Sequence, residues 1–188
     1  MEALLRKEII VSRAHCRIFA MTVCVVLTAL SAFIRIPLPF TPVPLTVQTM
    51  FVLLTGALLG ARLGGMAQAG YLLLGIAGVP VFTGMGSGLW YFTGPTAGYL
   101  LGFVPAAMLI AALLRGNPRN PFLIVGAFLA AAAVILTSGA IWLKILLGYG
   151  PGHVFTIGVL PFIPGDILKA VAASVIYLRL RPRLGAVL

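Results

Sequence analysis

One acidic and one basic side chain near the end of the sequence have the spacing of a recognition pair. Asp166 and Lys169 follow a Pro-Phe-Ile-Pro-Gly run and stand three residues apart, so they share one face of a helix. A carboxylate accepts hydrogen bonds from N–H groups, and an ammonium donates to carbonyls or carboxylates. The pair therefore suits a small ligand that presents both donors and acceptors. The alternative is a structural ion pair that only fixes helix packing.

The other residue types offer little catalytic chemistry. Glu2 and Glu8 lie in a polar N-terminal extension, and His15 and His153 have no partner at a useful spacing. The two cysteines form no CxxC motif. No Gly-Lys-Ser/Thr sequence occurs, so the chain has no P-loop for ATP. We expect a binding protein rather than an enzyme, with no metal and no cofactor of its own.

Glycines and aromatic residues dominate the stretch 80–99. Glycine allows backbone shapes that are closed to other residues. Trp90, Tyr91 and Tyr99 supply flat apolar walls with polar tips, so we predict that this stretch lines or caps the ligand pocket. For Trp90 and Tyr91 the alternative is an aromatic belt at the membrane interface.

The elements that carry these residues are predicted to lie in a membrane. The 188 residues are 61% hydrophobic and only 9% charged, with a mean hydropathy of +1.15. A soluble domain carries about 25% charged residues. This excludes an ordinary cytosolic enzyme, a disordered tail and a secreted disulfide scaffold. The net charge of +10 would suggest nucleic acid in a soluble protein, but here we expect it to reflect membrane topology, with the lipid bilayer and no nucleic acid as partner.

Six apolar segments reach or approach the roughly 20 residues of a spanning helix. We predict an all-α integral membrane protein with a single membrane domain, 1–188, and helices near 18–36, 44–61, 63–80, 95–114, 122–147 and 154–178. If both termini are cytoplasmic, ten of the thirteen basic residues lie inside: Arg6, Lys7, Arg13, Arg17, Arg62, Arg115, Arg119, Arg179, Arg181 and Arg183. Only Arg35 and Lys144 fall at outer helix ends, and this asymmetry favours that orientation.

Two further patterns concern gating and assembly. The loop at 37–44 is rigidified by four prolines while its ends can hinge, which predicts a gate. Its prolines are Pro37, Pro39, Pro42 and Pro44. Ala20, Cys24 and Thr28 repeat at four-residue spacing in the first apolar segment, and small residues at this spacing let helices approach closely. This stripe predicts either an internal seam or a docking face for another membrane subunit.

Four ordered motifs in the chain resemble the BioY family of biotin transporters. They are 43–49 (VPLTVQT) followed by 56–64 (GALLGARLG), 78–82 (GVPVF), 94–103 (GPTAGYLLGF) and 161–169 (PFIPGDILK). The resemblance covers roughly residues 18–180. The last motif is the most specific, and it contains the Asp166–Lys169 pair.

The resemblance implies a function in vitamin uptake. BioY proteins are the substrate-binding S components of energy-coupling factor (ECF) transporters, so the chain is expected to be a six-helix bundle in the cytoplasmic membrane of a prokaryote. It is expected to capture biotin with high affinity at the outer face. The implied partners are a coupling membrane subunit (EcfT-like) and two ATPase subunits. The family's first helix docks on the coupling subunit, which favours docking for Ala20, Cys24 and Thr28, although Cys and Thr replace alanine at two steps.

The chemistry of biotin agrees with the residues singled out above. Its ureido ring has two N–H donors and one carbonyl, which suits acceptance by Asp166 and donation by Lys169. Gln48 and Thr46 are suited to neutral hydrogen bonds. Three cations remain open as partners for the biotin carboxylate: Arg35, Lys144 and Lys169. Two other functions also stay open: an S component for another small vitamin, and a proton-coupled secondary carrier that uses Asp166.

Overall fold

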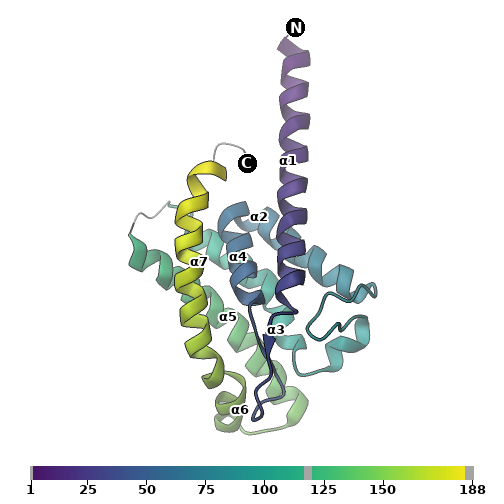
Figure 1. The fold of residues 1–188 in the computed structure, drawn as a ribbon, viewed down its shortest axis with the longest axis vertical. Coiled ribbons are helices and arrows are strands. Elements are labelled where there is room, and N and C mark those ends of the chain that lie inside the picture. Colours follow the sequence, from purple (N-terminus) through teal and green to yellow (C-terminus); the bar gives the residue numbers. More distant parts are fainter. Residues whose placement is uncertain (1, 117–119, 185–188) are drawn as a thin grey trace.

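The computed structural model describes residues 2–116 and 120–184, and helices dominate this part of the chain (Figure 1). The helices are α1 (Glu2–Ser31), α2 (Gln48–Ile76), α3 (Ala97–Leu101), α4 (Phe103–Leu113), α5 (Pro121–Leu147), α6 (Pro151–Gly158) and α7 (Ile163–Leu184). Two short 3-10 turns accompany them, η1 (Leu89–Thr93) and η2 (Leu160–Phe162). The strands β1 (Arg35–Ile36) and β2 (Leu45–Thr46) form a small antiparallel pair.

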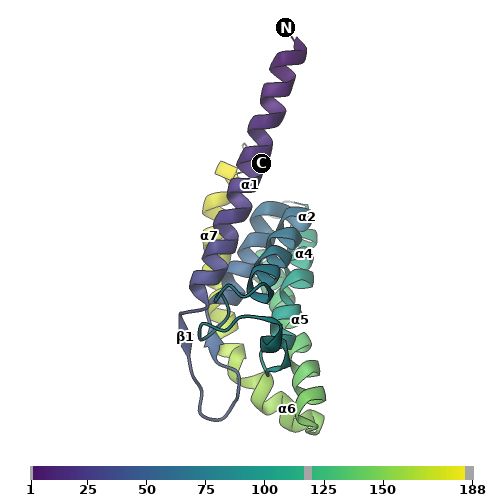
Figure 2. The same cartoon turned by 90° about the vertical axis from the view of Figure 1, so that its right-hand side faces the viewer.

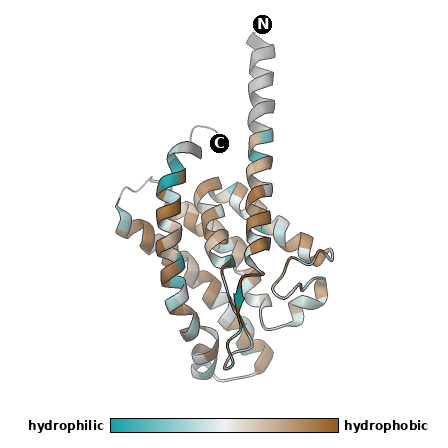
Figure 3. Cartoon of the chain, in the orientation of Figure 1, coloured by the Kyte–Doolittle hydropathy of each residue, from teal (hydrophilic) through white to brown (hydrophobic). Residues whose placement is uncertain are grey.

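Four helical stretches of the described residues are long and apolar enough to cross a membrane. They are Ala14–Ser31, Gln48–Ile76, Pro121–Leu147 and Pro151–Pro182, with Ala97–Leu113 as a shorter apolar helix. Hydrophobic residues cover these helices, whereas hydrophilic residues gather at the end of α7 (Figure 3). The all-helical membrane architecture expected from composition is therefore present.

Helix α2 reverses direction within its length. Gly60 has a φ of +82° and a ψ of 173°, which are not helical angles. A Cβ on Gly64 would lie only 2.8 Å from the Cα of Gly56, although eight residues of continuous helix span about 12 Å. The chain therefore turns back at Gly60, at the end of the segment expected at 44–61 and just before the one expected at 63–80. The absence of a Cβ at Gly60 makes its left-handed backbone accessible.

Two expected segment boundaries differ because the connection between α1 and α2 is extended. Helix α1 ends at Ser31 rather than near 36, and α2 begins at Gln48 rather than near 44. Between them the chain forms a hairpin in which Arg35 pairs with Thr46 and Ile36 with Leu45. The four prolines of this connection exclude helix there.

The single helix expected over 154–178 is interrupted. Helix α6 ends at Gly158 and α7 begins at Ile163, with η2 between them. Pro161 and Pro164 lack the N–H groups that a continuous helix needs, so the chain kinks at this point. As a result Asp166 lies in the first turn of α7, directly after the interruption.

Close packing against small residues holds the bundle together. A Cβ on Gly56 would lie 2.1 Å from the carbonyl oxygen of Ala107, so α2 and α4 approach to backbone contact. Large side chains such as Tyr71, Phe82 and Phe128 are fully buried between the helices. Helix α1 packs on the outside of the bundle. Only 11% of its apolar stretch is buried, and its N-terminal part extends beyond the bundle (Figure 2).

Candidate ligand-binding site

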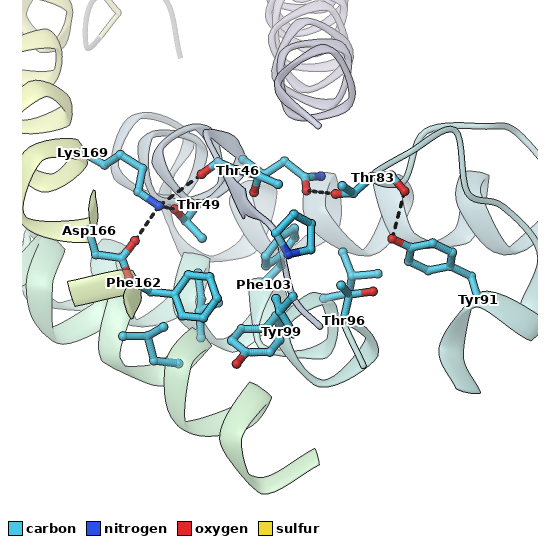
Figure 4. A pocket seen from close by; sticks show the side chains of 16 residues that line it. Thr46, Thr49, Thr83, Tyr91, Thr96, Tyr99, Phe103, Phe162, Asp166 and Lys169 are labelled. Atoms are coloured by element: carbon cyan, nitrogen blue, oxygen red, sulfur yellow. Dashed lines mark hydrogen bonds and ion pairs between the residues drawn. The ribbon is translucent and has the colours of Figure 1, made fainter. Parts of the chain in front are cut away.

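A narrow cavity of about 50 Å³ lies where the starts of α2, α3 and α7 meet α5 (Figure 4). Six of the seven residues predicted to bind ligand line it: Thr46, Gln48, Tyr91, Tyr99, Asp166 and Lys169. The hairpin before α2 and the loop after it bring the first three of these to the same place as the start of α7. The interruption after α6 is what positions Asp166 there.

The ammonium of Lys169 is held by three acceptors. Its Nζ lies 2.5 Å from Oδ1 of Asp166 and donates to Oγ1 of Thr49 at 2.6 Å and to the carbonyl oxygen of Thr46 at 3.2 Å. An ammonium has three N–H donors, so these contacts occupy all of them. The expected donation from Lys169 to a ligand carbonyl would require one of these bonds to be given up.

Asp166 and Thr49 retain capacity for a ligand. Asp166 is 6% exposed, and its second carboxylate oxygen makes no hydrogen bond with the described residues. Thr49 accepts from Lys169, which leaves its own O–H proton free to donate. The polar end of the cavity therefore offers an acceptor at Asp166 and a donor at Thr49, both oriented by Lys169.

A second polar network ties the loop after α2 to the cavity. The amide nitrogen of Gln48 donates to the hydroxyl of Tyr71 at 2.6 Å, and that hydroxyl donates to the carbonyl of Val81 at 2.9 Å. Thr83 donates to the amide oxygen of Gln48 at 3.2 Å, and Tyr91 donates to the carbonyl of Thr83 at 3.1 Å. Gln48 and Tyr91 therefore hold the loop in place, and one N–H of Gln48 remains for a ligand.

Aromatic and aliphatic side chains form the middle of the cavity. The rings of Tyr99 and Phe162 pack at a tilt of 54° with their centroids 5.9 Å apart, and Phe103 lies beside them in Figure 4. The hydroxyl of Tyr99 donates to the carbonyl of Gly158 at 2.6 Å, which ties α3 to α6. Tyr99 is thus an apolar wall with its polar tip already satisfied.

Trp90, the seventh predicted site residue, lies outside this cavity. It is 84% exposed and lines a neighbouring depression of about 410 Å³, here called the Arg35 groove. The groove is lined by Arg35, Pro42, Pro44, Thr83, Trp90, Tyr91, Thr93, Gly94, Pro95 and Thr96. Four of these residues also line the cavity: Pro44, Thr83, Tyr91 and Thr96. The two spaces therefore adjoin, and the exposure of Trp90 agrees better with the interface alternative.

The proline loop at 37–44 reaches both spaces. Pro44 lines the cavity and the groove, and Pro42 lines the groove. Pro37 and Pro39 are exposed and line neither of them. The loop also meets the loop after α2, because a Cβ on Gly84 would lie 2.6 Å from Nη1 of Arg35.

The small-residue stripe of α1 turns inward at its end. Thr28 is fully buried and accepts a hydrogen bond from Nε2 of Gln68 on α2 at 3.5 Å. Ala20 and Cys24 are half-buried. The side chain of Thr28 is therefore covered by α2 in this structure. The internal seam, the other interpretation of the stripe, fits Thr28.

The sequence interpretation missed several residues that line the cavity. Thr49, Thr83, Thr96, Phe103, Ile135 and Phe162 all contribute to it. Thr49 had a usable signal, since it is a polar residue directly after Gln48, at the start of an apolar helix. Ile135 had none, because apolar residues of α5 that face lipid and those that face the cavity are chemically alike. Among the described residues, no group of three metal-ligating side chains occurs.

The comparisons with known proteins all match proteins of biotin transport. The model of the BioY family matches residues 6–186. A probable biotin transporter BioY of Pyrococcus horikoshii is 41% identical over 157 residues, which cover 84% of this chain and 91% of that protein. The biotin transporter BioY of Thermotoga maritima is 35% identical, covering 82% of this chain and 89% of that protein.

A solved structure has the same fold. The crystal structure of the S component for biotin from an ECF-type ABC transporter superposes with a TM-score of 0.84 and 29% sequence identity. The match covers 90% of this chain and 92% of that one.

Proposed function

The chain belongs to the BioY family, and from this premise we propose that it binds biotin with high affinity at the outer face of the cytoplasmic membrane and delivers it inward as the S component of an ECF-type transporter. The observation that carries the proposal is the Asp166–Lys169–Thr49 cluster at one end of the cavity, in which Asp166 is buried and the other two residues are partly buried. Ionisable groups at membrane depth are expensive and normally face a ligand path or a partner.

The proposed topology is a single membrane domain that crosses the bilayer six times with both termini inside. The reversal of α2 at Gly60 supports it, because this helix then supplies two of the crossings. The shorter apolar stretch Ala97–Leu113 supplies another, so the four long candidate stretches and these two additions make six. The positive-inside asymmetry supplies the orientation.

In the proposed pose, the ureido ring lies against the polar cluster. Its N–H groups donate to Asp166, and its carbonyl accepts from the hydroxyl of Thr49. Lys169 contacts both groups and holds them in place. The thiophane ring and the valeryl chain then lie among the apolar and aromatic side chains toward Tyr91, which stands at the opposite end of the cavity in Figure 4.

The carboxylate of biotin is proposed to reach the Arg35 groove. Of the three cations that the sequence left open, Lys169 has all its donors occupied, and Lys144 is exposed and lines neither space. Arg35 lines the groove that adjoins the Tyr91 end of the cavity. A guanidinium is well suited to a carboxylate because its fork of N–H donors matches both oxygens.

Release inward requires partners that this chain lacks. The coupling subunit and two ATPases are proposed to favour a second state of the chain by binding it more tightly than the biotin-loaded state. The apolar groove of about 590 Å³ between α1 and the second half of α2 is the surface that we propose for the coupling subunit. The proline loop, whose Pro44 lines the cavity, is proposed as the gate.

Calorimetric titration of biotin into the purified protein tests the proposed site. Wild type should bind one biotin per chain. Asp166→Asn should weaken binding by about 10- to 100-fold, because a hydrogen bond to a charged group is worth roughly 1.5–3 kcal/mol. The matched control Lys144→Gln, which changes an exposed charge outside the cavity, should bind as wild type does.

The same experiment can contradict the proposal in two ways. Failure of a folded wild-type sample to bind biotin would remove biotin as ligand. Tight binding that is unchanged in Asp166→Asn would return the ion pair to a purely structural role.

A comparison of biotin with biotin amide tests whether Arg35 binds the carboxylate. Arg35→Gln should weaken binding of biotin about tenfold but leave binding of biotin amide, which lacks the carboxylate, nearly unchanged. Equal losses for the two ligands would show that Arg35 acts through loop structure rather than on the carboxylate.

A further inference from the structure

A second pocket lies at the far end of the bundle from the ligand cavity. It encloses about 610 Å³ between the turn of α2, the end of α4 and the last turns of α7. We name it the Arg115–Arg181 pocket, after the two cations in its lining. Arg181 comes fifteen residues after Asp166 on α7, about 22 Å further along the helix axis. The pocket is therefore separate from the proposed biotin site.

The lining of this pocket divides into an apolar and a cationic part. Leu58 and Leu114 belong to the apolar part, and Arg115 and Arg181 contribute two guanidinium groups. The described residues that line it include no carboxylate. The guanidinium of Arg181 lies over the ring of Tyr177, with 5.8 Å between its central carbon and the ring centroid. This contact orients the cation instead of leaving it to move freely in solvent.

The turn at Gly60 helps to create this space. Ala57, Leu58, Leu59 and Gly60 line the pocket where the first half of α2 ends. A Cβ on Gly60 would meet nothing within 4 Å, so the turn leaves open space around it. The pocket therefore follows from the reversal of α2.

We propose that the Arg115–Arg181 pocket binds the phosphate headgroup of an anionic phospholipid, with an acyl chain along its apolar wall. Two guanidinium groups match the charge and geometry of a phosphate, and the apolar wall matches a lipid rather than a free phosphate. Basic pockets between spanning helices on the cytoplasmic side are suited to such headgroups. The placement of this pocket on the cytoplasmic side rests on the topology proposed above, whereas its lining comes directly from the structure.

Lipid titration monitored by native mass spectrometry tests this proposal. Delipidated protein in neutral detergent is titrated with phosphatidylglycerol or with phosphatidylcholine. Wild type should prefer phosphatidylglycerol by about 30-fold, from roughly 1 kcal/mol for each of the two basic residues. The double variant Arg115→Gln/Arg181→Gln should lose this preference. The matched variant Arg62→Gln/Arg179→Gln removes two exposed arginines outside the lining and should keep it.

Three outcomes would overturn the lipid site. The first is no preference for phosphatidylglycerol in wild type. The second is an equal loss in both double variants, which would indicate general surface charge. The third is displacement of the lipid by glycerol 3-phosphate at equal concentration, which would indicate a soluble phosphate ligand. Biotin titration of each variant separates this test from the biotin proposal, because binding at the Asp166 cluster should be unchanged.

Discussion

Lys169 acts on the site through the groups it holds. Its ammonium joins the start of α7 to β2 through the carbonyl of Thr46 and to the start of α2 through the hydroxyl of Thr49. Each bond to a charged donor is stronger than a neutral one. The residue therefore fixes three elements around the polar end of the cavity, and in the proposed pose the ligand meets Asp166 and Thr49 rather than Lys169 itself.

Replacement of Thr49 tests this arrangement at the scale of one hydroxyl. Thr49→Val removes the hydroxyl while keeping the shape, so it should weaken biotin binding by about tenfold and leave one N–H of Lys169 without an acceptor. Thr49→Ser keeps the hydroxyl and should bind within a few-fold of wild type. Calorimetric titration distinguishes the two variants. Equal behaviour of the two would mean that Thr49 contributes volume rather than a hydrogen bond.

At the scale of elements, glycines decide how closely α5 approaches its neighbours. A Cβ on Gly139 would lie 2.3 Å from the ring of Tyr99, which lines the cavity. A Cβ on Gly98 would lie 2.1 Å from Cβ of Trp142, so the contact between α3 and α5 is tight from both sides. The same helix also carries Gly126, where an added Cβ would meet nothing within 4 Å.

The two glycines of α5 form a matched pair for mutation. Gly139→Ala should destabilise the protein by about 1–3 kcal/mol, because the new methyl group overpacks against Tyr99. It should also weaken biotin binding, since Tyr99 is displaced. Gly126→Ala should be neutral or stabilising by up to about 1 kcal/mol, because alanine favours helix. Thermal unfolding in detergent measures both effects, and a similar loss in the two variants would contradict the packing argument.

At the scale of the whole molecule, the order of crossings determines which loops face each side. In the proposed topology, the proline loop and the Arg35 groove face outward. The turn at Gly60 and the end of α7 face the cytoplasm. The proline loop and the Arg35 groove adjoin the ligand cavity. The turn at Gly60 and the end of α7 line the Arg115–Arg181 pocket.

Single-cysteine labelling tests the topology in intact cells. In a background with Cys16 and Cys24 replaced by alanine, Thr41→Cys should react with a membrane-impermeant maleimide added outside. Arg62→Cys should react only after the membrane is permeabilised. Labelling of both positions from outside would rule out the reversal of α2 as a pair of crossings.

Much of the helical framework and part of the site could be predicted from the sequence. The i, i+3 spacing correctly indicated that Asp166 and Lys169 meet on one helix face, because helix geometry alone determines this contact. The proline-rich connection correctly separated α1 from α2. The interruption after α6 was missed, although Pro161 and Pro164 supplied a signal for it.

Other features could not be predicted because the sequence of a membrane helix gives little indication of which of its faces is buried in the protein. Lipid-facing and core-facing positions are both apolar, so the burial of Thr28 against Gln68 and the exposure of Trp90 depend on packing that no local pattern records. The role of Thr49 depends on β2, α2 and α7 meeting, which is a contact over 120 residues of sequence.

The chain also contains its own optical probe of the loop over the cavity. It has two tryptophans, and the indole N–H of Trp142 donates to the carbonyl of Gly94 at 2.9 Å, across from α5 to the loop before α3. Trp90 is the exposed one, so Trp90→Phe leaves Trp142 as the single tryptophan, whose emission depends on that bond. Movement of the loop away from α5 would change the emission of Trp142, and stopped-flow fluorescence could then time the closing of the site without any attached dye.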